Sequence, residues 1–209
     1  MPLEAHLEDI LNNLSQQGYC VVPGFLNGDL SQQLYQHAVE IPSQFWNTAA
    51  IGRAQQQTIN TMVRTDRIYW LSLHQPIQKL YLNIMESLRT AINRDLFLGL
   101  FDYECHFAHY PDGAFYKKHL DAFKGRSNRK LTTVLYLNDG WLDEHGGQLV
   151  IYGKRGEVLE TVKPERGTLV VFLSDKFVHE VLPSRRDRLS ITGWFRLNSS
   201  LSGVIDPPR

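Results

Sequence analysis

Cysteine is scarce in this chain, since Cys20 and Cys105 are the only two among 209 residues. Two thiols are too few for the disulfide framework on which small secreted proteins depend, and they fit a reducing compartment. We expect Cys105 to be a buried apolar residue rather than a thiolate that binds a metal. A disulfide-stabilised scaffold is therefore excluded.

Long apolar runs and an excess of one charge are also missing. No uninterrupted apolar run is long enough to span a bilayer, and the first residues lack the basic start and apolar core of a signal peptide. Lys plus Arg and Asp plus Glu each total 22, so the net charge is zero, which argues against nucleic acid as the main partner. We expect a cytoplasmic protein with no membrane partner, folded as a single domain over residues 1–209.

Apolar residues at helical spacing predict a largely helical N-terminal part, residues 1–97, with short early strands at 19–22 and 64–71. The polar, Gln-rich residues 43–62 are expected to form a loop or an irregular hairpin. Three helices are expected: from about Leu3 to Gly18, from Asn27–Asp29 to before Pro42, and from Pro76 onward. The third helix should bury one apolar set, which consists of Ile77, Leu80, Ile84, Leu88 and Ile92.

From residue 98 to 197 the pattern changes to short β-prone runs separated by Gly-containing turns, and residues 198–209 form a tail. The runs are 100–110, 114–121, 131–138, 147–152, 157–162, 168–173, 177–182 and 188–197. Eight short strands at this spacing predict an antiparallel double sheet, either a jelly roll or a sandwich. The fold class is therefore mainly β, with the N-terminal helices packed on one sheet.

The last predicted strand has two different faces. Arg188, Ser190 and Thr192 alternate with apolar residues, so the polar set would point into the interior if the apolar set packs under the helices. A buried, unpaired arginine is costly, and a carboxylate ligand would relieve that cost through two parallel hydrogen bonds. In the strand 131–138, Tyr136 would face the same interior with a hydroxyl that needs a partner.

The segment that contains His119 and Asp121 indicates a metal site. On a strand these two side chains point the same way, within reach of one ion, and His179 could complete the set from a distant strand. Two imidazoles and one carboxylate suit non-haem Fe(II), because they leave coordination positions open for substrates. Zn²⁺ bound for hydrolysis is the alternative metal for the same residues.

Several ordered segments resemble the Fe(II)- and 2-oxoglutarate-dependent dioxygenases of the prolyl 4-hydroxylase type, above all the hypoxia-factor prolyl hydroxylases and their bacterial relatives. The resemblance covers roughly residues 60–197. Its motifs are Arg64-Thr65-Asp66-Arg67-Ile68-Tyr69-Trp70, His109-Tyr110-Pro111, Tyr116-Lys117-Lys118-His119-Leu120-Asp121, Leu135-Tyr136-Leu137-Asn138-Asp139-Gly140-Trp141, Gly146-Gly147-Gln148-Leu149 and the run from Phe172 through Trp194.

The resemblance implies a double-stranded β-helix, which is a jelly roll with the metal at one open end. It implies that the iron ligands are His119, Asp121 and His179. It further implies that Arg188 binds the distal carboxylate of 2-oxoglutarate with help from Tyr136, and that Thr192 and Tyr110 line the cosubstrate pocket.

The reaction that the resemblance implies is hydroxylation at an unactivated C–H bond, with Fe(II), 2-oxoglutarate and O₂ as cofactor and cosubstrates and ascorbate (vitamin C) as an accessory reductant. The expected partner is a protein that presents a flexible, proline-containing loop, with elongation factor Tu as the leading candidate. The enzyme itself is expected to be a monomer. A free amino acid or a small metabolite is the alternative substrate.

Other interpretations remain open at this point. The strand at Arg188 loosely resembles that of nucleic-acid demethylases, although Ser190 replaces their Asn, and a non-catalytic jelly-roll sensor is a further possibility. The basic loop 124–130 is either a solvated turn or a surface that steers an acidic substrate segment. His106 and His109 lie three apart on a predicted strand, which makes them a poor metal pair.

Overall fold

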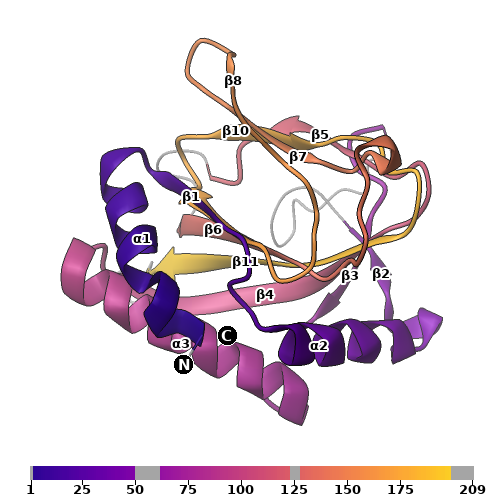
Figure 1. Cartoon of the computed structure of the whole chain (residues 1–209), viewed down its shortest axis with the longest axis horizontal. Coiled ribbons are helices and arrows are strands. Elements are labelled where there is room, and N and C mark those ends of the chain that lie inside the picture. Colours follow the sequence, from indigo (N-terminus) through magenta and orange to yellow (C-terminus); the bar gives the residue numbers. More distant parts are fainter. Residues whose placement is uncertain (1, 50–61, 123–127, 199–209) are drawn as a thin grey trace, which may run out of the picture.

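The computed structural model describes residues 2–49, 62–122 and 128–198. Two antiparallel sheets of seven and four strands face each other, and the larger sheet lies between the helices and the smaller sheet (Figure 1). This arrangement is the double-stranded β-helix that the sequence predicted, with helices on one face. None of the helices in the described ranges is long and apolar enough to cross a membrane.

The large sheet carries the C-terminal strand at its centre. Its strands, in spatial order, are β1 (Tyr19–Val22), β9 (Leu169–Leu173), β6 (Arg129–Tyr136), β11 (Arg188–Leu197), β4 (Leu100–Tyr110), β3 (Arg67–Trp70) and β2 (Asn47–Thr48). The small sheet consists of β5 (Tyr116–His119), β10 (Val178–Val181), β7 (Leu149–Tyr152) and β8 (Val158–Val162). Two short 3₁₀ helices, η1 (Ser43–Phe45) and η3 (Asp143–His145), lie in connections.

All eight strands predicted after residue 98 are confirmed, and two of them differ at their ends in ways that affect the site. The first is β6, which stops at Tyr136 because Asn138 takes over the pairing with β11 by its side chain. Its Oδ1 accepts from the Leu189 N–H at 2.6 Å, and its Nδ2 donates to the Leu189 carbonyl at 3.0 Å. The second is β5, which stops at His119, so Asp121 lies in a bend beyond the strand rather than on it.

The three helices occur where the sequence predicted them: α1 (Pro2–Gln16), α2 (Gly28–Glu40) and α3 (Pro76–Leu96). Gly18 ends the first with φ +85°, a left-handed conformation that glycine adopts without strain. The Asn27 side chain caps the second by accepting from the Leu30 N–H at 3.0 Å. Local capping chemistry therefore determines where these helices begin and end.

The predicted buried face of α3 was partly wrong. Leu80 is 52% exposed, whereas Tyr81 and Gln78 are fully buried. The Tyr81 hydroxyl hydrogen-bonds to Tyr103, and the Gln78 amide oxygen accepts from the Ser72 N–H at 2.8 Å. Because these polar groups have partners inside the fold, the buried face includes them and leaves Leu80 outside.

The early region between α2 and α3 also differs from its prediction. The expected strand 64–71 is shorter, since β3 covers only Arg67–Trp70. Within residues 43–62, expected to be a loop or an irregular hairpin, the described residues form η1 and the strand β2, which pairs antiparallel with β3 outside that segment. Residues 50–61 of that segment, 124–127 of the basic loop and 199–209 of the expected tail lie outside the described residues.

Candidate metal centre

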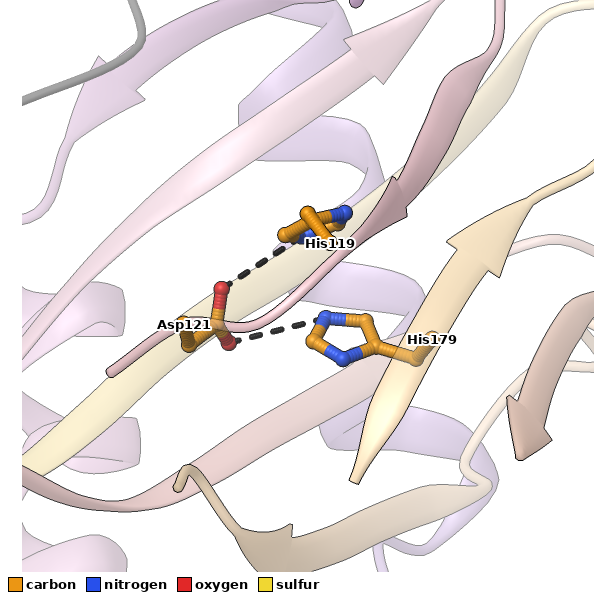
Figure 2. A group of neighbouring side chains, drawn as sticks. All are labelled: His119, Asp121 and His179. Atoms are coloured by element: carbon orange, nitrogen blue, oxygen red, sulfur yellow. Dashed lines mark ion pairs between the residues drawn. The ribbon is translucent and has the colours of Figure 1, made fainter. Parts of the chain in front are cut away.

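Three side chains converge in the space between the two sheets. His119 comes from the end of β5, Asp121 from the bend that follows, and His179 from β10, and one ligand atom of each lies within 4.8 Å of the others. The Nε2 atom of His119 is 3.4 Å from Asp121 Oδ1, and that of His179 is 3.6 Å from Asp121 Oδ2. Figure 2 shows both rings pointing toward the carboxylate, as a shared ion requires.

Strand pairing explains why the two imidazoles meet. Strands β5 and β10 are antiparallel, and His119 lies directly opposite His179 in their register. Side chains at paired positions share a face, and here the ring centroids are 4.2 Å apart. Asp121 joins them although β5 has already ended. The predicted grouping of the three residues is thus realised, whereas the predicted strand geometry for Asp121 was wrong.

Backbone carbonyls orient both imidazoles. The Nδ1 atom of His119 lies 2.7 Å from the Lys117 carbonyl, and the Nδ1 atom of His179 lies 3.1 Å from the Phe177 carbonyl. A carbonyl only accepts, so each Nδ1 carries the proton and donates it, which leaves the Nε2 lone pair free for a metal.

The ionisation of the site suits metal binding. Burial lowers the pKa of His179 to about 4, and the neighbouring His119 acts in the same direction. Burial alone would raise the pKa of Asp121, but the neighbouring His179 and His119 hold that pKa well below its usual range. A neutral imidazole and an ionised carboxylate are the forms in which these groups bind a metal.

Aromatic rings pack against both histidine ligands and limit the rotation of their imidazoles. Tyr116 stacks on His119 with ring centroids 3.5 Å apart, and Phe172 meets His179 edge-on at 4.7 Å. The guanidinium of Arg64 lies 4.3 Å from the centre of the Tyr116 ring and is itself paired with the buried Asp66. The sequence offered Arg64, Asp66 and Tyr116 only as parts of motifs, without a role.

Arg188 forms the second half of the site and is 1% exposed. Its Nε donates to the Gly147 carbonyl at 2.9 Å, and its guanidinium lies 4.8 Å from the Tyr110 ring and 5.0 Å from the Tyr136 ring. Within the described chain, neither Arg188 Nη2 nor the Tyr136 hydroxyl has a hydrogen-bond partner. A buried, charged donor without a partner is costly and indicates that an anionic ligand belongs beside Arg188.

The metal group and the arginine share one cavity. Tyr110, Arg188 and Thr192 line it together with His119, Asp121 and His179. Tyr136 is not part of the lining, and its ring centre lies 5.0 Å from the Arg188 guanidinium. Burial raises the pKa of its phenol to about 12, although the guanidinium opposes that rise. Six of the seven residues predicted for the site therefore line one cavity, and the seventh, Tyr136, lies against Arg188.

The donor set fits the Fe(II) and the anionic cosubstrate that the sequence suggests. Two imidazole nitrogens and one carboxylate form the three-ligand arrangement of non-haem Fe(II) sites, and the buried Arg188 with its free Nη2 supplies a cationic anchor beside it. His106 lines the same cavity but stays outside the metal group, and His109 faces away and contacts Asp187 at 3.1 Å. The prediction that they do not form a metal pair agrees with this placement.

Arg129 was expected in a basic loop and is instead the first residue of β6. Its guanidinium lies 3.4 Å from the centre of the Trp194 ring and pairs with Glu104 at 3.1 Å, so it is part of the cavity wall. Cys105 is buried as predicted, and burial raises the pKa of its thiol. Neither residue belongs to the metal group.

Comparison with known proteins agrees with this geometry. The model of the 2OG-Fe(II) oxygenase superfamily matches residues 105–196. A crystal structure of a prolyl-4-hydroxylase from Pseudomonas putida is 41% identical, covers 92% of this chain and 100% of that one, and has a TM-score of 0.84. A Trichoplax adhaerens prolyl hydroxylase, solved with a peptide of the hypoxia inducible factor oxygen degradation domain, is 27% identical over 92% of this chain and 90% of that one, with a TM-score of 0.83.

The human Egl nine homolog 1 is 28% identical over 92% of this chain, and the Caenorhabditis elegans hypoxia-inducible factor prolyl hydroxylase is 26% identical over 90% of it. The chain spans 47% and 28% of the lengths of these two relatives. The bacterial structure, in contrast, is matched along its whole length. On this identity and on the shared fold, the chain belongs to the 2OG-Fe(II) oxygenase superfamily, in the group of the prolyl 4-hydroxylases.

Proposed function

We propose that this chain is a 2-oxoglutarate-dependent hydroxylase of prolyl residues in a protein. The observation that carries the proposal is the buried, unpartnered Nη2 donor of Arg188, which lines the same cavity as the His119, Asp121 and His179 donor set. With Fe(II), 2-oxoglutarate and O₂ bound, such a site oxidises an unactivated C–H bond and converts 2-oxoglutarate to succinate and CO₂.

The chain's own residues would divide the work between holding the metal and holding the cosubstrate. His119, Asp121 and His179 would bind the iron and leave coordination positions open. Arg188 would bind the carboxylate of 2-oxoglutarate that is distal to the metal, with the Tyr136 hydroxyl as a second donor. Tyr110 and Thr192 would form walls of that pocket, and its burial would exclude water from the reacting groups.

A protein substrate is supported by the relatives rather than by the cavity itself. The Pseudomonas putida structure is of a prolyl-4-hydroxylase, and the Trichoplax adhaerens enzyme was solved with a peptide bound. We extend this to a flexible, proline-containing loop, with elongation factor Tu as the first candidate. A free amino acid or small metabolite is the alternative substrate, because the residues around the metal do not themselves select a polypeptide.

The experiment is oxidation of a cell extract in vitro. Purified protein is incubated with Fe(II), 2-oxoglutarate and ascorbate, and the extract is searched by mass spectrometry for prolines that gained the mass of one oxygen atom. We expect such a proline, with elongation factor Tu as the first protein to inspect, and no gain with the His179→Ala variant. Turnover with free proline but with no protein would reject the protein substrate in favour of the small-molecule alternative.

A further inference from the structure

Asp121 is held in place by the sheet opposite the one that supplies the other ligands. The strand that carries His119 ends before Asp121, so no strand pairing fixes the position of this carboxylate. Its Oδ2 instead accepts two hydrogen bonds, from Thr132 Oγ1 at 2.7 Å and from Trp194 Nε1 at 3.0 Å. Thr132 and Trp194 are direct cross-strand partners in β6 and β11, in the centre of the large sheet.

We infer that Thr132 and Trp194 are positioning residues, which fix the orientation of Asp121 and thereby the affinity of the site for its metal. The inference rests on the proposed function only in taking His119, Asp121 and His179 as the metal ligands. With two donors on Oδ2, the other carboxylate oxygen, Oδ1, is the one that faces the Nε2 atom of His119. The two bonds also join the sheets across the cavity.

The Thr132 hydroxyl has a defined direction. Asp121 is ionised and can only accept, so Thr132 Oγ1 donates to it, and the Ser174 hydroxyl at 2.9 Å from Thr132 Oγ1 donates in turn. Thr132 is 1% and Ser174 0% exposed, so no solvent competes for these bonds. Ser174 also restrains the chain after Asp121, since its carbonyl accepts from the Ala122 N–H at 3.3 Å.

The Trp194 indole is equally restrained. It is 6% exposed, and the Arg129 guanidinium covers one side at 3.4 Å from the ring centre. Arg129 is held by Glu104, and His106 packs against Trp194 with ring centroids 5.5 Å apart. A cation over an indole is a favourable contact, so the ring is held where its N–H meets the carboxylate.

Partners that orient a metal ligand have a measurable effect on the metal. Loss of one such partner weakens metal affinity about 10- to 100-fold in characterised sites. We therefore expect Thr132→Val, which keeps the shape and removes the hydroxyl, to weaken metal binding about 10-fold. Trp194→Phe, which keeps an aromatic ring under Arg129 and removes the N–H, should have a similar effect. Thr132→Ser should restore nearly the wild-type affinity, because it retains the donor.

The test is a titration of the metal-free full chain with Mn²⁺, followed by calorimetry, so that no turnover is needed. Two matched controls lose a hydrogen bond elsewhere in the fold. They are Thr133→Val, whose hydroxyl contacts Tyr103 at 2.7 Å on the opposite face of β6, and Trp46→Phe, whose N–H donates to the Ile41 carbonyl at 3.3 Å. Both should bind Mn²⁺ like the wild type even if they lower the melting temperature.

The possible outcomes distinguish failure of the positioning role from failure of the proposed metal site. If Thr132→Val binds Mn²⁺ as tightly as wild type while His179→Ala does not bind it, the positioning role is wrong and the metal site stands. If Thr133→Val weakens binding as much as Thr132→Val, the effect is general destabilisation and the inference is also wrong. If His179→Ala binds Mn²⁺ like the wild type, the proposed metal site itself is wrong. If Trp194→Phe does not fold, the Mn²⁺ affinity of Thr132→Val by itself tests the positioning role.

Discussion

His119 and His179 are 60 residues apart in the sequence and directly opposed in the register of β5 and β10. Because side chains alternate along a strand, a slip of one residue in this pairing would turn one imidazole away from the other. The pairing is therefore part of the site and not only of the fold. The third ligand, Asp121, lacks such a register and depends on side chains of the other sheet.

The first prediction concerns Arg188. Substitution of Arg188 by Met removes the cationic donor while keeping an apolar stem, and a hydrogen bond to a charged group contributes about 1.5–3 kcal/mol. The KM for 2-oxoglutarate in succinate formation should therefore rise at least about 10-fold. Tyr136→Phe should give a smaller rise.

Arg186→Met is the matched control for Arg188→Met. Arg186 lies two positions earlier in the same basic stretch, at 4.9 Å from the Trp141 ring, and outside the cavity lining. Its substitution should leave the KM for 2-oxoglutarate unchanged. An unaltered KM in Arg188→Met would remove Arg188 from the role of carboxylate anchor.

The second prediction concerns stability in acid. Burial lowers the pKa of His106 to about 4, whereas the unfolded chain has the usual imidazole value near 6.5. The unfolded state therefore binds a proton first as the pH falls, and the native state is destabilised between about pH 6.5 and pH 4. Relative to His106→Phe, the wild type should lose about 2 kcal/mol of unfolding free energy between pH 7 and pH 5.

Urea unfolding of both proteins at the two pH values measures this difference. It should be done without added metal, so that metal release does not contribute. If the two proteins lose the same free energy between pH 7 and pH 5, His106 is not buried in its neutral form and this assignment is wrong.

The third prediction concerns Gly193 in the centre of β11. A Cβ atom at this position would collide with the Tyr103 hydroxyl and with the Cβ atom of Cys105. Gly193→Ala should therefore lower the free energy of unfolding by about 1–3 kcal/mol, the usual cost of an overpacked core. Gly28→Ala is the control, because no atom lies within 4 Å of the Cβ added there.

Thermal unfolding of the two glycine variants measures this difference in stability. Gly28→Ala should melt at or slightly above the wild-type temperature, since it lies in the first turn of α2. A Gly193→Ala variant as stable as the wild type would mean that Tyr103 moves aside without cost, which its bond to Thr133 at 2.7 Å argues against.

Much of the site could be predicted because its signals are local. The polar face of 188–197 follows from alternation along one strand, and the His119 and Asp121 pair lies within three residues. Neither signal needs knowledge of the other sheet. Turn glycines and helix caps likewise determine where their own strand or helix begins and ends. The predicted strand and helix positions were confirmed for this reason.

What the sequence did not reveal depends on contacts between distant segments. Thr132 and Trp194 sit on predicted strands, but only the packing of one sheet over the other shows that both donate to Asp121. The exposure of Leu80 follows from the partners that Gln78 and Tyr81 find in other elements. Periodicity identifies a face as apolar or polar, but it does not identify the atoms on the other side.

The central claim is that His119, Asp121, His179 and Arg188 form one iron- and 2-oxoglutarate-dependent site for prolyl oxidation. It is tested most directly by measuring succinate and hydroxyproline together, with a prolyl protein substrate found in the extract experiment. We predict equal amounts of the two products with the wild type and Fe(II), and neither product with His179→Ala. Undiminished prolyl oxidation by His179→Ala, or by the wild type without iron, would contradict the account.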